Sequence, residues 1–154
     1  MTLNGFLVKA KTSTYASKKE FDKRILEDGA KELVFEDHEF KYRDRYYGFN
    51  PFVGEEIVWK NGNIIWSMNY YGKIVSDVVS AKKIYEFLKI AMRQVKEDRP
   101  FRGPDYFKSD YFEYVDKSSG DINDFFGTEK ILFKGEEIYK LIYHGGIVKQ
   151  PKFG

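Results

Sequence analysis

Two stripes of apolar residues recur at helical spacing, and each predicts a helix. The first follows Thr2, a residue type that often caps helices, and consists of Leu3, Phe6, Leu7 and Ala10. The second follows Ser80, another good cap, and consists of Ile84, Phe87, Leu88, Ala91, Met92 and Val95. Between them, Ser17 and Glu20 stand at capping-box spacing, which predicts a helical segment ending at Gly29.

The rest of the chain follows the period-two pattern of β-strands. Strands are predicted between residues 32 and 74, and again at 111–117, 130–134 and 137–144. The clearest turn is Asn61-Gly62, because Asn-Gly supplies the two positive φ angles of a type I′ hairpin. Lys134-Gly135 predicts the last turn. The elements therefore run in the order helix, strands, helix, strands.

The two halves of the chain are similar to each other. Residues 40–48 align with 112–120, and residues 55–75 align with 129–148 when Asn61 is skipped. This alignment has 13 identities in 29 positions, where ordinary composition would give roughly two or three. We therefore predict a single domain over residues 1–154, with repeats over about 3–76 and about 80–150. The predicted fold class is α+β: internally duplicated helix-then-antiparallel-strands units with pseudo-twofold symmetry, and with the helices packed on one sheet face.

Several motifs along the chain are distinctive in combination. They are Tyr42-Arg43-Asp44-Arg45-Tyr46-Tyr47-Gly48, Gly54-Glu55-Glu56, Met68-Asn69-Tyr70-Tyr71-Gly72, Phe101-Arg102-Gly103-Pro104 and Tyr143-His144-Gly145-Gly146. On these motifs the chain resembles a prokaryotic family of uncharacterised domains, and the resemblance covers nearly the whole sequence. Some members look like the C-terminal part of transcription regulators that begin with a Xre-type helix-turn-helix. We expect no such module ahead of Phe6, and the resemblance implies no activity or catalytic residue.

Composition and charge argue against several classes of function. Lys plus Arg number 26 and Asp plus Glu 24, so the net charge of +2 favours neither nucleic acid nor an anionic membrane as a partner of this chain alone. The absence of cysteine removes disulfides, thiolate nucleophiles and thiolate metal sites. No segment approaches the ~18 apolar residues of a membrane span or has the pattern of a signal peptide. The expected location is cytoplasmic.

Metal and cofactor chemistry have little support in the sequence. The only histidines are His38 and His144, and no closely spaced group of carboxylates completes a ligand set with either. No nucleophile elbow, phosphate-binding loop or dinucleotide-binding turn occurs. We therefore expect no metal and no cofactor.

Three acidic residues are candidates for chemistry. Glu55 and Glu129 are paired by the alignment, and Asp44 follows two aromatic residues at period two. Acids at matching places in the two halves could converge and act as an acid/base pair. The alternative is structural, since acids at strand ends often bond backbone amides or pair with arginine.

Polar and aromatic residues that differ between the halves are candidates for ligand binding. Guanidinium and aromatic groups together suit a planar or anionic ligand through stacking and bidentate hydrogen bonds. The candidate residues are Arg43, Arg45, Asn69, Tyr71, Arg102 and His144. The alternative is a solvated strand surface with cross-strand salt bridges.

The sequence favours a non-enzymatic small-ligand-binding or sensor-type domain, with a small-molecule ligand as its partner. One alternative is a small hydrolase or isomerase that uses paired carboxylates. Another is a protein-interaction module. Two carboxylates in a cleft with perturbed titration would favour the enzyme, and a flat exposed aromatic patch would favour the interaction module.

Overall fold

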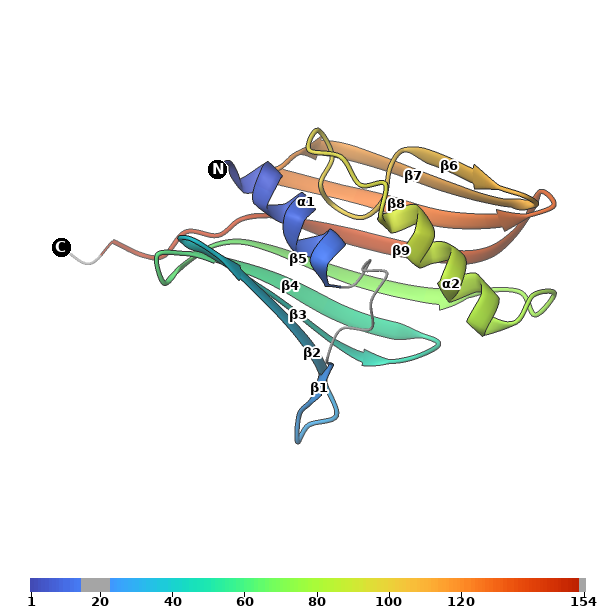
Figure 1. Cartoon of the computed structure of the whole chain (residues 1–154), viewed down its shortest axis with the longest axis horizontal. Helices are drawn as coiled ribbons and strands as arrows, with labels where there is room; N and C mark the ends of the chain where they lie inside the picture. The colour runs from blue at the N-terminus through green and yellow to red at the C-terminus, as the bar shows by residue number, and fades with distance from the viewer. Residues whose placement is uncertain (15–22, 153–154) are drawn as a thin grey trace.

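One antiparallel sheet dominates the structure. The computed structural model describes residues 1–14 and 23–152. In this part of the chain, nine strands form a single sheet in the order β1-β2-β3-β4-β5-β9-β8-β7-β6, accompanied by two helices (Figure 1). The two longest strands, β5 and β9, therefore pair at the centre of the sheet.

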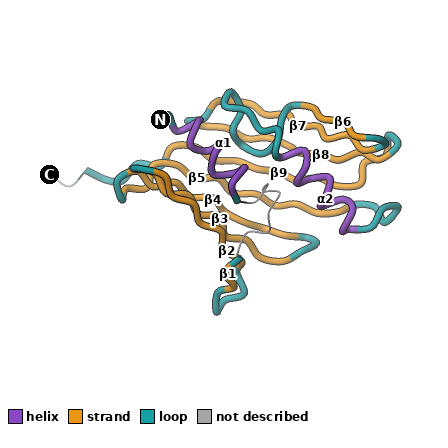
Figure 2. The backbone as a smooth tube through the Cα atoms, in the orientation of Figure 1, coloured by secondary structure: helices purple, strands orange, loops and turns teal. Residues whose placement is uncertain are grey.

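The elements of the first half are α1 (Leu3–Ser13), β1 (Arg24–Ile25), β2 (Lys31–Asp37), β3 (Phe40–Gly48), β4 (Phe52–Lys60) and β5 (Asn63–Ile74). Those of the second half are α2 (Ala81–Met92), β6 (Tyr106–Ser109), β7 (Phe112–Asp121), β8 (Asp124–Phe133) and β9 (Glu136–Ile147). A long connection over residues 93–105 joins α2 to β6 and is drawn as loop in Figure 2.

Both predicted helix starts are confirmed. The side-chain oxygen of Thr2 accepts a hydrogen bond from the backbone N–H of Gly5 at 3.0 Å. That of Ser80 accepts from the N–H of Lys83 at 3.3 Å. Each cap satisfies a backbone donor that the first helical turn leaves without a partner.

The predicted helical segment between the two helices is wrong for the residues of it that the structure describes. Residues 17–22 of this segment lie outside the described residues. Arg24–Ile25 is a strand that pairs with β2, and residues 27–29 form a turn. Pairing with the neighbouring strand overrides the local helical spacing here, because propensity is a weak guide where tertiary contacts compete.

Both predicted hairpin turns are confirmed. Asn61 and Gly62 have φ angles of 50° and 82°, and Lys134 and Gly135 have 50° and 81°. Two successive residues with positive φ are the mark of a type I′ turn, whose twist matches that of the flanking strands. The turns set the pairing of β4 with β5 and of β8 with β9.

Alternation along the strands separates two faces of the sheet. We call the side with buried residues the core face and the opposite side the open face. The buried residues include Trp66, Met68 and Tyr70 on β5, and Tyr139, Leu141 and Tyr143 on β9. Buried helical residues belong to the same apolar cluster, with Phe6 stacked on Phe40 at 4.8 Å and Phe87 on Phe112 at 4.9 Å between ring centroids.

The predicted fold class is wrong. The structure is mostly one nine-stranded antiparallel sheet with two short helices, and not an α+β domain of duplicated units with a layer of helices on one sheet face. The physical reason lies in the strands. They reach 12 residues in β5 and β9, and the strands supply most of the buried hydrophobic residues, many of them large aromatic side chains. The assignment of one domain with two repeats stays a prediction.

Candidate functional site

Four buried acids lie on the core face in two matching pairs. Asp44 on β3 stands opposite Glu56 on β4, and Asp116 on β7 stands opposite Glu129 on β8. Each of the four is at most 3% exposed. Carboxylates this deeply buried need hydrogen-bonding or charged partners, since an isolated buried charge costs several kcal/mol or more.

Buried tyrosines supply part of that partnership. Tyr70 donates its hydroxyl hydrogen to Asp44 at 2.6 Å, and Tyr143 donates to Asp116 at 2.7 Å. Tyr114 and Tyr139 donate to the two oxygens of Glu129 at 2.5 Å and 2.8 Å. Tyr70 and Tyr143 are register partners on β5 and β9, so the two pairs of acids meet at the centre of the sheet.

Buried cations are the other partners of these acids. Lys11 on α1 donates to Glu56 at 2.5 Å and to the carbonyl of Phe101 at 2.6 Å. Arg102 binds both oxygens of Glu129, at 3.1 Å and 3.0 Å, in the bidentate geometry that suits a carboxylate. These contacts tie α1 and the connection after α2 to the sheet.

Asp44 and Asp116 differ in their cationic partners. The guanidinium of Arg99 forms an ion pair with Asp116 at 3.1 Å. Among the described residues, no ion pair involves Asp44. Asp44 therefore depends on the Tyr70 hydroxyl and on more distant charges.

Burial changes the titration of this network. The pKa of Asp44 is raised to about 7, chiefly because burial removes its solvent and secondly because the Glu56 carboxylate lies nearby. Loss of solvent and then Glu129 raise the pKa of Asp116 to about 6. Burial also holds the pKa of Tyr70 and Tyr114 well above the usual value, so both hydroxyls stay protonated donors. The network can bind and release protons near neutral pH.

Two glycines make room for the central tyrosines. A Cβ on Gly54 would lie well inside van der Waals contact of the Tyr70 ring, and a Cβ on Gly127 would do the same to Tyr143. Each glycine is the register partner of the tyrosine that it admits: Gly54 of Tyr70 and Gly127 of Tyr143. The tyrosine rings therefore lie flat across the neighbouring strand, where their hydroxyls reach the acids.

We expect Gly54→Ala to lower the free energy of unfolding by about 1–3 kcal/mol, because the Tyr70 ring must move away from Asp44. Urea denaturation measures the change. The same substitution in a Tyr70→Ala background should cost much less, and an equal cost in both backgrounds would show that the ring is not the obstacle.

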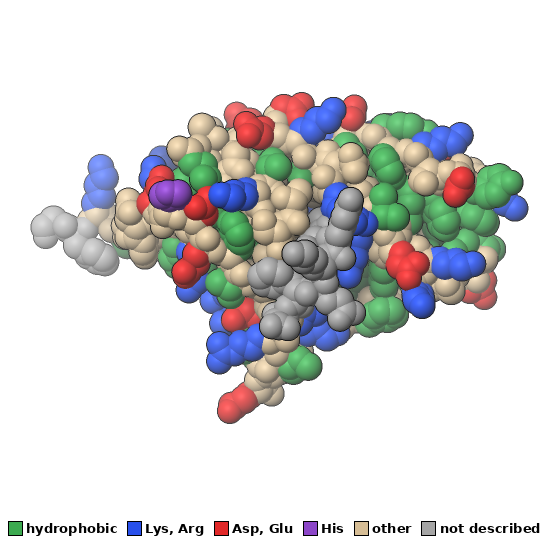
Figure 3. All heavy atoms as spheres, in the orientation of Figure 1, with side chains coloured by type: hydrophobic (Ala, Val, Ile, Leu, Met, Phe, Trp, Pro, Cys, Tyr) green, Lys and Arg blue, Asp and Glu red, His purple; other side chains and the backbone are tan. Residues whose placement is uncertain are grey.

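A pocket opens beside Tyr70. Its cavity volume is about 190 Å³, and it is walled by aromatic side chains and bordered by lysines. The lining residues are Lys23, Lys31, Tyr46, Gly48, Phe49, Phe52, Tyr70, Tyr85 and Lys89. Figure 3 shows basic side chains next to hydrophobic ones over the part of the molecule that contains α2.

The aromatic walls of the pocket pack edge to face. Ring centroids are 5.0 Å apart for Phe49 and Tyr85, 6.1 Å for Phe52 and Tyr85, and 6.0 Å for Phe52 and Tyr70. Tyr85 also donates its hydroxyl hydrogen to the carbonyl of Phe49 at 2.5 Å. The walls are thus held in place by one another.

At the matching place in the second half, the chain's own aromatic ring fills the space. Phe101 stacks on Phe125 with 3.9 Å between centroids and 11° between planes, and lies 6.0 Å from Tyr143. Phe125 and Tyr143 there have nearly the same separation, 6.1 Å, as Phe52 and Tyr70 in the first half. The space next to Phe52 and Tyr70 is therefore suited to a planar ring.

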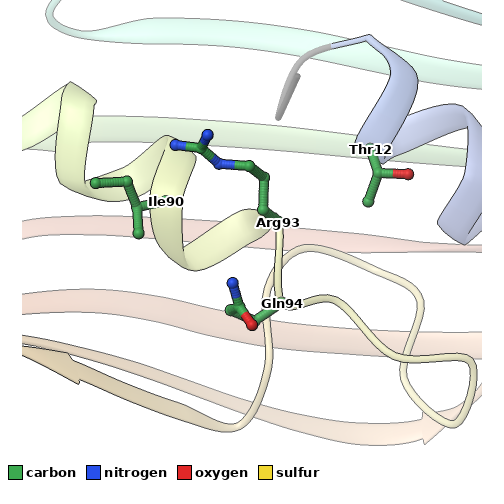
Figure 4. Close-up of a pocket in the computed structure, with 4 residues that line it drawn as sticks. All are labelled: Thr12, Ile90, Arg93 and Gln94. Carbon is green, nitrogen blue, oxygen red and sulfur yellow. The ribbon is translucent and has the colours of Figure 1, made fainter. Parts of the chain in front are cut away.

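A second depression lies between the helices. Figure 4 shows Thr12 on α1, Ile90 on α2, and Arg93 and Gln94 directly after α2. Among its described lining residues none is aromatic, and Arg93 alone is titratable. It offers a ligand fewer specific contacts than the aromatic pocket.

Most of the predicted ligand-binding residues lie on the open face. Arg45, Glu55, Asn69 and His144 form one row of register partners across β3, β4, β5 and β9. Arg45 binds Glu32 at 2.5 Å. Tyr71, on the same face, has Ile142 as its partner and is a diagonal neighbour of His144. The structure therefore brings these side chains onto one exposed surface.

Two of the predicted ligand-binding residues are separated from that row. Arg43 lies on the open face but stacks over the Trp59 ring, with 5.1 Å between its guanidinium carbon and the ring centroid. Arg102 is buried, 2% exposed, among the acids behind the sheet. The six predicted residues thus do not surround one opening.

The predicted acids divide in the same way. Asp44 and Glu129 are buried on the core face, whereas Glu55 is exposed on the open face. The partner that corresponds to Glu129 is Glu56, which the sequence reasoning missed. A signal was present: Gly54 and Gly127 each precede a buried glutamate by two positions. The aromatic pocket and Lys11 were missed as well, because long-range packing creates them.

Two further findings concern chemistry and location. Among residues 1–14 and 23–152, no group of three or more His, Asp or Glu side chains could hold a metal ion. In the same residues, no helix is long and apolar enough to cross a membrane.

Comparison with known proteins gives one match. The model of a family described as a domain of unknown function, DUF5680, matches residues 44–148. No curated protein and no solved structure matches the chain. The matched range includes the four buried acids and the aromatic lining residues of the pocket, but not α1, Lys23 or Lys31.

Proposed function

Because the chain belongs to the DUF5680 family, whose description names no activity, we propose from its geometry that it is a non-enzymatic domain that binds a small planar ligand in the aromatic pocket. One observation carries this proposal. Among the described residues, the space beside Phe52 and Tyr70 is a pocket, while the matching space beside Phe125 and Tyr143 holds the ring of Phe101. A planar ligand would make in the first half the contacts that Phe101 makes in the second.

The size of the pocket limits the ligand. Sites for drug-sized ligands enclose roughly 300–1,000 Å³, and this cavity encloses about 190 Å³. A single ring or a fused pair with a short substituent suits it. Edge-to-face packing against Tyr85 and Phe52 would hold such a ring without a large rearrangement.

Catalysis by paired carboxylates has less support. Glu55 and Glu129 lie on opposite faces of the sheet, so they cannot act on one substrate. The carboxylates that do lie close together are deeply buried and hydrogen-bonded to tyrosines. Binding without chemistry is the better account of the pocket.

The binding would serve sensing. On its sequence motifs the chain resembles a family of which some members look fused behind a Xre-type helix-turn-helix, and we propose that it acts in the cytoplasm as the ligand-responsive part of such a system. Tyr70 links the pocket to the buried network, since its ring lines the pocket while its hydroxyl binds Asp44. Occupancy of the pocket could therefore reach α1 and the connection after α2 through the network.

A second candidate function is protein interaction through the open face. Its exposed apolar side chains include Tyr71 at 51%, Ile142 at 58% and Phe126 at 63% exposure. Such a patch, next to the predicted residues Arg45, Asn69 and His144, favours contact with another protein. Sedimentation of the purified chain over a range of concentrations tests whether the chain itself is that partner.

The pocket is tested with Phe49→Ala. We expect small aromatic probes such as indole and benzoate to raise the melting temperature of the unchanged chain, since a ligand that binds only the folded state stabilises it. Phe49 is 59% exposed, so its removal should leave the fold intact, yet it takes away one wall of the pocket. The probe-induced shift should then fall by half or more.

Phe126→Ala is the matched control. Phe126 is 63% exposed and lies on the open face, away from the pocket lining. It should keep the full shift. The proposal is wrong if no aromatic probe shifts the melting temperature, or if both variants respond like the unchanged chain.

A further inference from the structure

We propose that the ligand of the aromatic pocket is a small aromatic carboxylate, whose ring lies against Phe52 and Tyr70 and whose carboxylate is bound by Lys31 and Lys89, with Lys23 beside them. This inference rests on the proposed function and names the chemical class of the ligand. It follows from the charges at the pocket, from their surroundings and from the shape of the cavity.

The charges at the pocket are all of one sign. Three lysines border it, and among the described residues no carboxylate belongs to its lining. Within the described residues, none of the three forms an ion pair with an acid. Elsewhere on this protein, cations such as Lys9 and Arg45 do pair with acids. Unpaired like charges around a partly enclosed space repel one another, and an anion between them removes that repulsion.

Two of the three lysines lie beside the same aromatic ring. The ammonium groups of Lys23 and Lys31 lie 5.5 Å and 5.6 Å from the ring centroid of Tyr46. Tyr46 is 8% exposed and is itself part of the lining. Cation–π attraction holds both ammonium groups at the pocket. Ammonium groups act as compact charges that bind an anion from several directions, without the fixed fork of arginine.

A positive charge on a ligand would find no partner among the described lining residues. The buried carboxyl in contact with the pocket wall is Asp44, which already accepts a hydrogen bond from Tyr70 and is 2% exposed. A cationic ligand would meet three ammonium groups and, in the part of the lining that the structure describes, would reach no exposed carboxylate. The ring and the charge of the ligand are thus recognised by different residues, the ring by Phe52 and Tyr70 and the charge by the lysines.

The test compares acids with amides of the same shape. Benzoate is paired with benzamide, and indole-3-carboxylate with indole-3-carboxamide, and binding to the full chain is measured by titration calorimetry. Each acid should bind at least about tenfold more tightly than its amide, because charge-assisted hydrogen bonds are about twice as strong as neutral ones. The advantage should shrink in high salt.

Lysine variants assign the charge to the pocket. Lys31→Met and Lys89→Met should each weaken binding of the acid by about tenfold and leave binding of the amide unchanged. Lys82→Met is the matched control, since Lys82 lies exposed on the same helix as Lys89 but outside the pocket lining. It should leave both affinities as they are.

The outcomes separate the two proposals. If acid and amide bind equally, the ligand class is wrong while a ring-binding pocket still stands. If the acid is preferred but neither Lys31→Met nor Lys89→Met weakens it, the carboxylate is bound elsewhere and this inference is wrong. If no acid or amide binds, the proposed function itself is overturned.

Discussion

Replacing Arg102 with methionine is expected to lower the free energy of unfolding by about 3–5 kcal/mol. Arg102 is 2% exposed and binds both oxygens of Glu129, which is fully buried. Methionine has a similar length and no charge, so the substitution removes the cation and leaves the carboxylate in the core. The hydroxyls of Tyr114 and Tyr139 still donate to Glu129, but neither offsets its charge.

Chemical denaturation of two variants separates the buried pair from an ordinary surface pair. Lys130 and Glu137 are 3.8 Å apart with side chains 46% and 37% exposed, so Lys130→Met should cost less than about 1 kcal/mol. Adding Glu129→Gln to Arg102→Met should recover part of the loss, since the uncompensated charge is gone. Equal, small costs for Arg102→Met and Lys130→Met would contradict the assignment of Arg102 as the main counter-charge of the core.

The second large effect is a dependence of stability on pH, caused by Asp44. Its pKa is about 7 in the folded protein and near 3.9 in an unfolded chain. Between these values the folded protein holds a proton that the unfolded chain has lost, so folding takes up a proton. Stability therefore falls as the pH rises from about 4 to about 7, by roughly 3–5 kcal/mol from this group. Asp116, with a pKa of about 6, acts in the same direction over a narrower range.

Asp44→Asn isolates this contribution. The amide still accepts the hydrogen bond from Tyr70 and does not titrate, so the variant should gain stability relative to the unchanged chain as the pH rises. Urea denaturation at pH 5 and pH 8 measures the difference. Asp77→Asn, at an exposed position before α2, is the control. Its stability should change with pH as that of the unchanged chain does. If the stability of the Asp44→Asn variant changes with pH in parallel with that of the unchanged chain, Asp44 is ionised in the folded protein and the expected pH dependence is wrong.

Local chemistry explains what the sequence could predict. The caps Thr2 and Ser80 and the turns at Asn61-Gly62 and Lys134-Gly135 act through neighbours only a few residues away. Alternation on β5 and β9 likewise needs only the period of a strand. These features were predicted correctly because no distant residue is required to form them. The helical segment before Gly29 was wrong at Arg24–Ile25, where pairing with β2 decides the conformation.

A shift of one residue explains the missed acid. The alignment of the halves matched Glu55 with Glu129, but the buried counterpart is Glu56. In a strand, one position moves a side chain to the opposite face, so Glu55 is exposed while Glu56 binds Lys11. Aligning Gly54 with Gly127 removes this shift, and also the gap at Asn61. The glycines hold the register because each admits a tyrosine ring.

By itself, the sequence determined the two helix starts, the hairpin turns and the strand alternation. Only the tertiary structure decided that one nine-stranded sheet dominates the fold, that Lys11 reaches Glu56 across 45 residues, and that Arg102 reaches Glu129 across 27. It also decided that Phe101 fills one aromatic space while the space beside Phe52 is a pocket. The physical reason is the distance along the sequence between the residues that interact. Caps, turns and strand periods depend on adjacent residues, whereas burial, charge pairing and cavities depend on which distant segments come together.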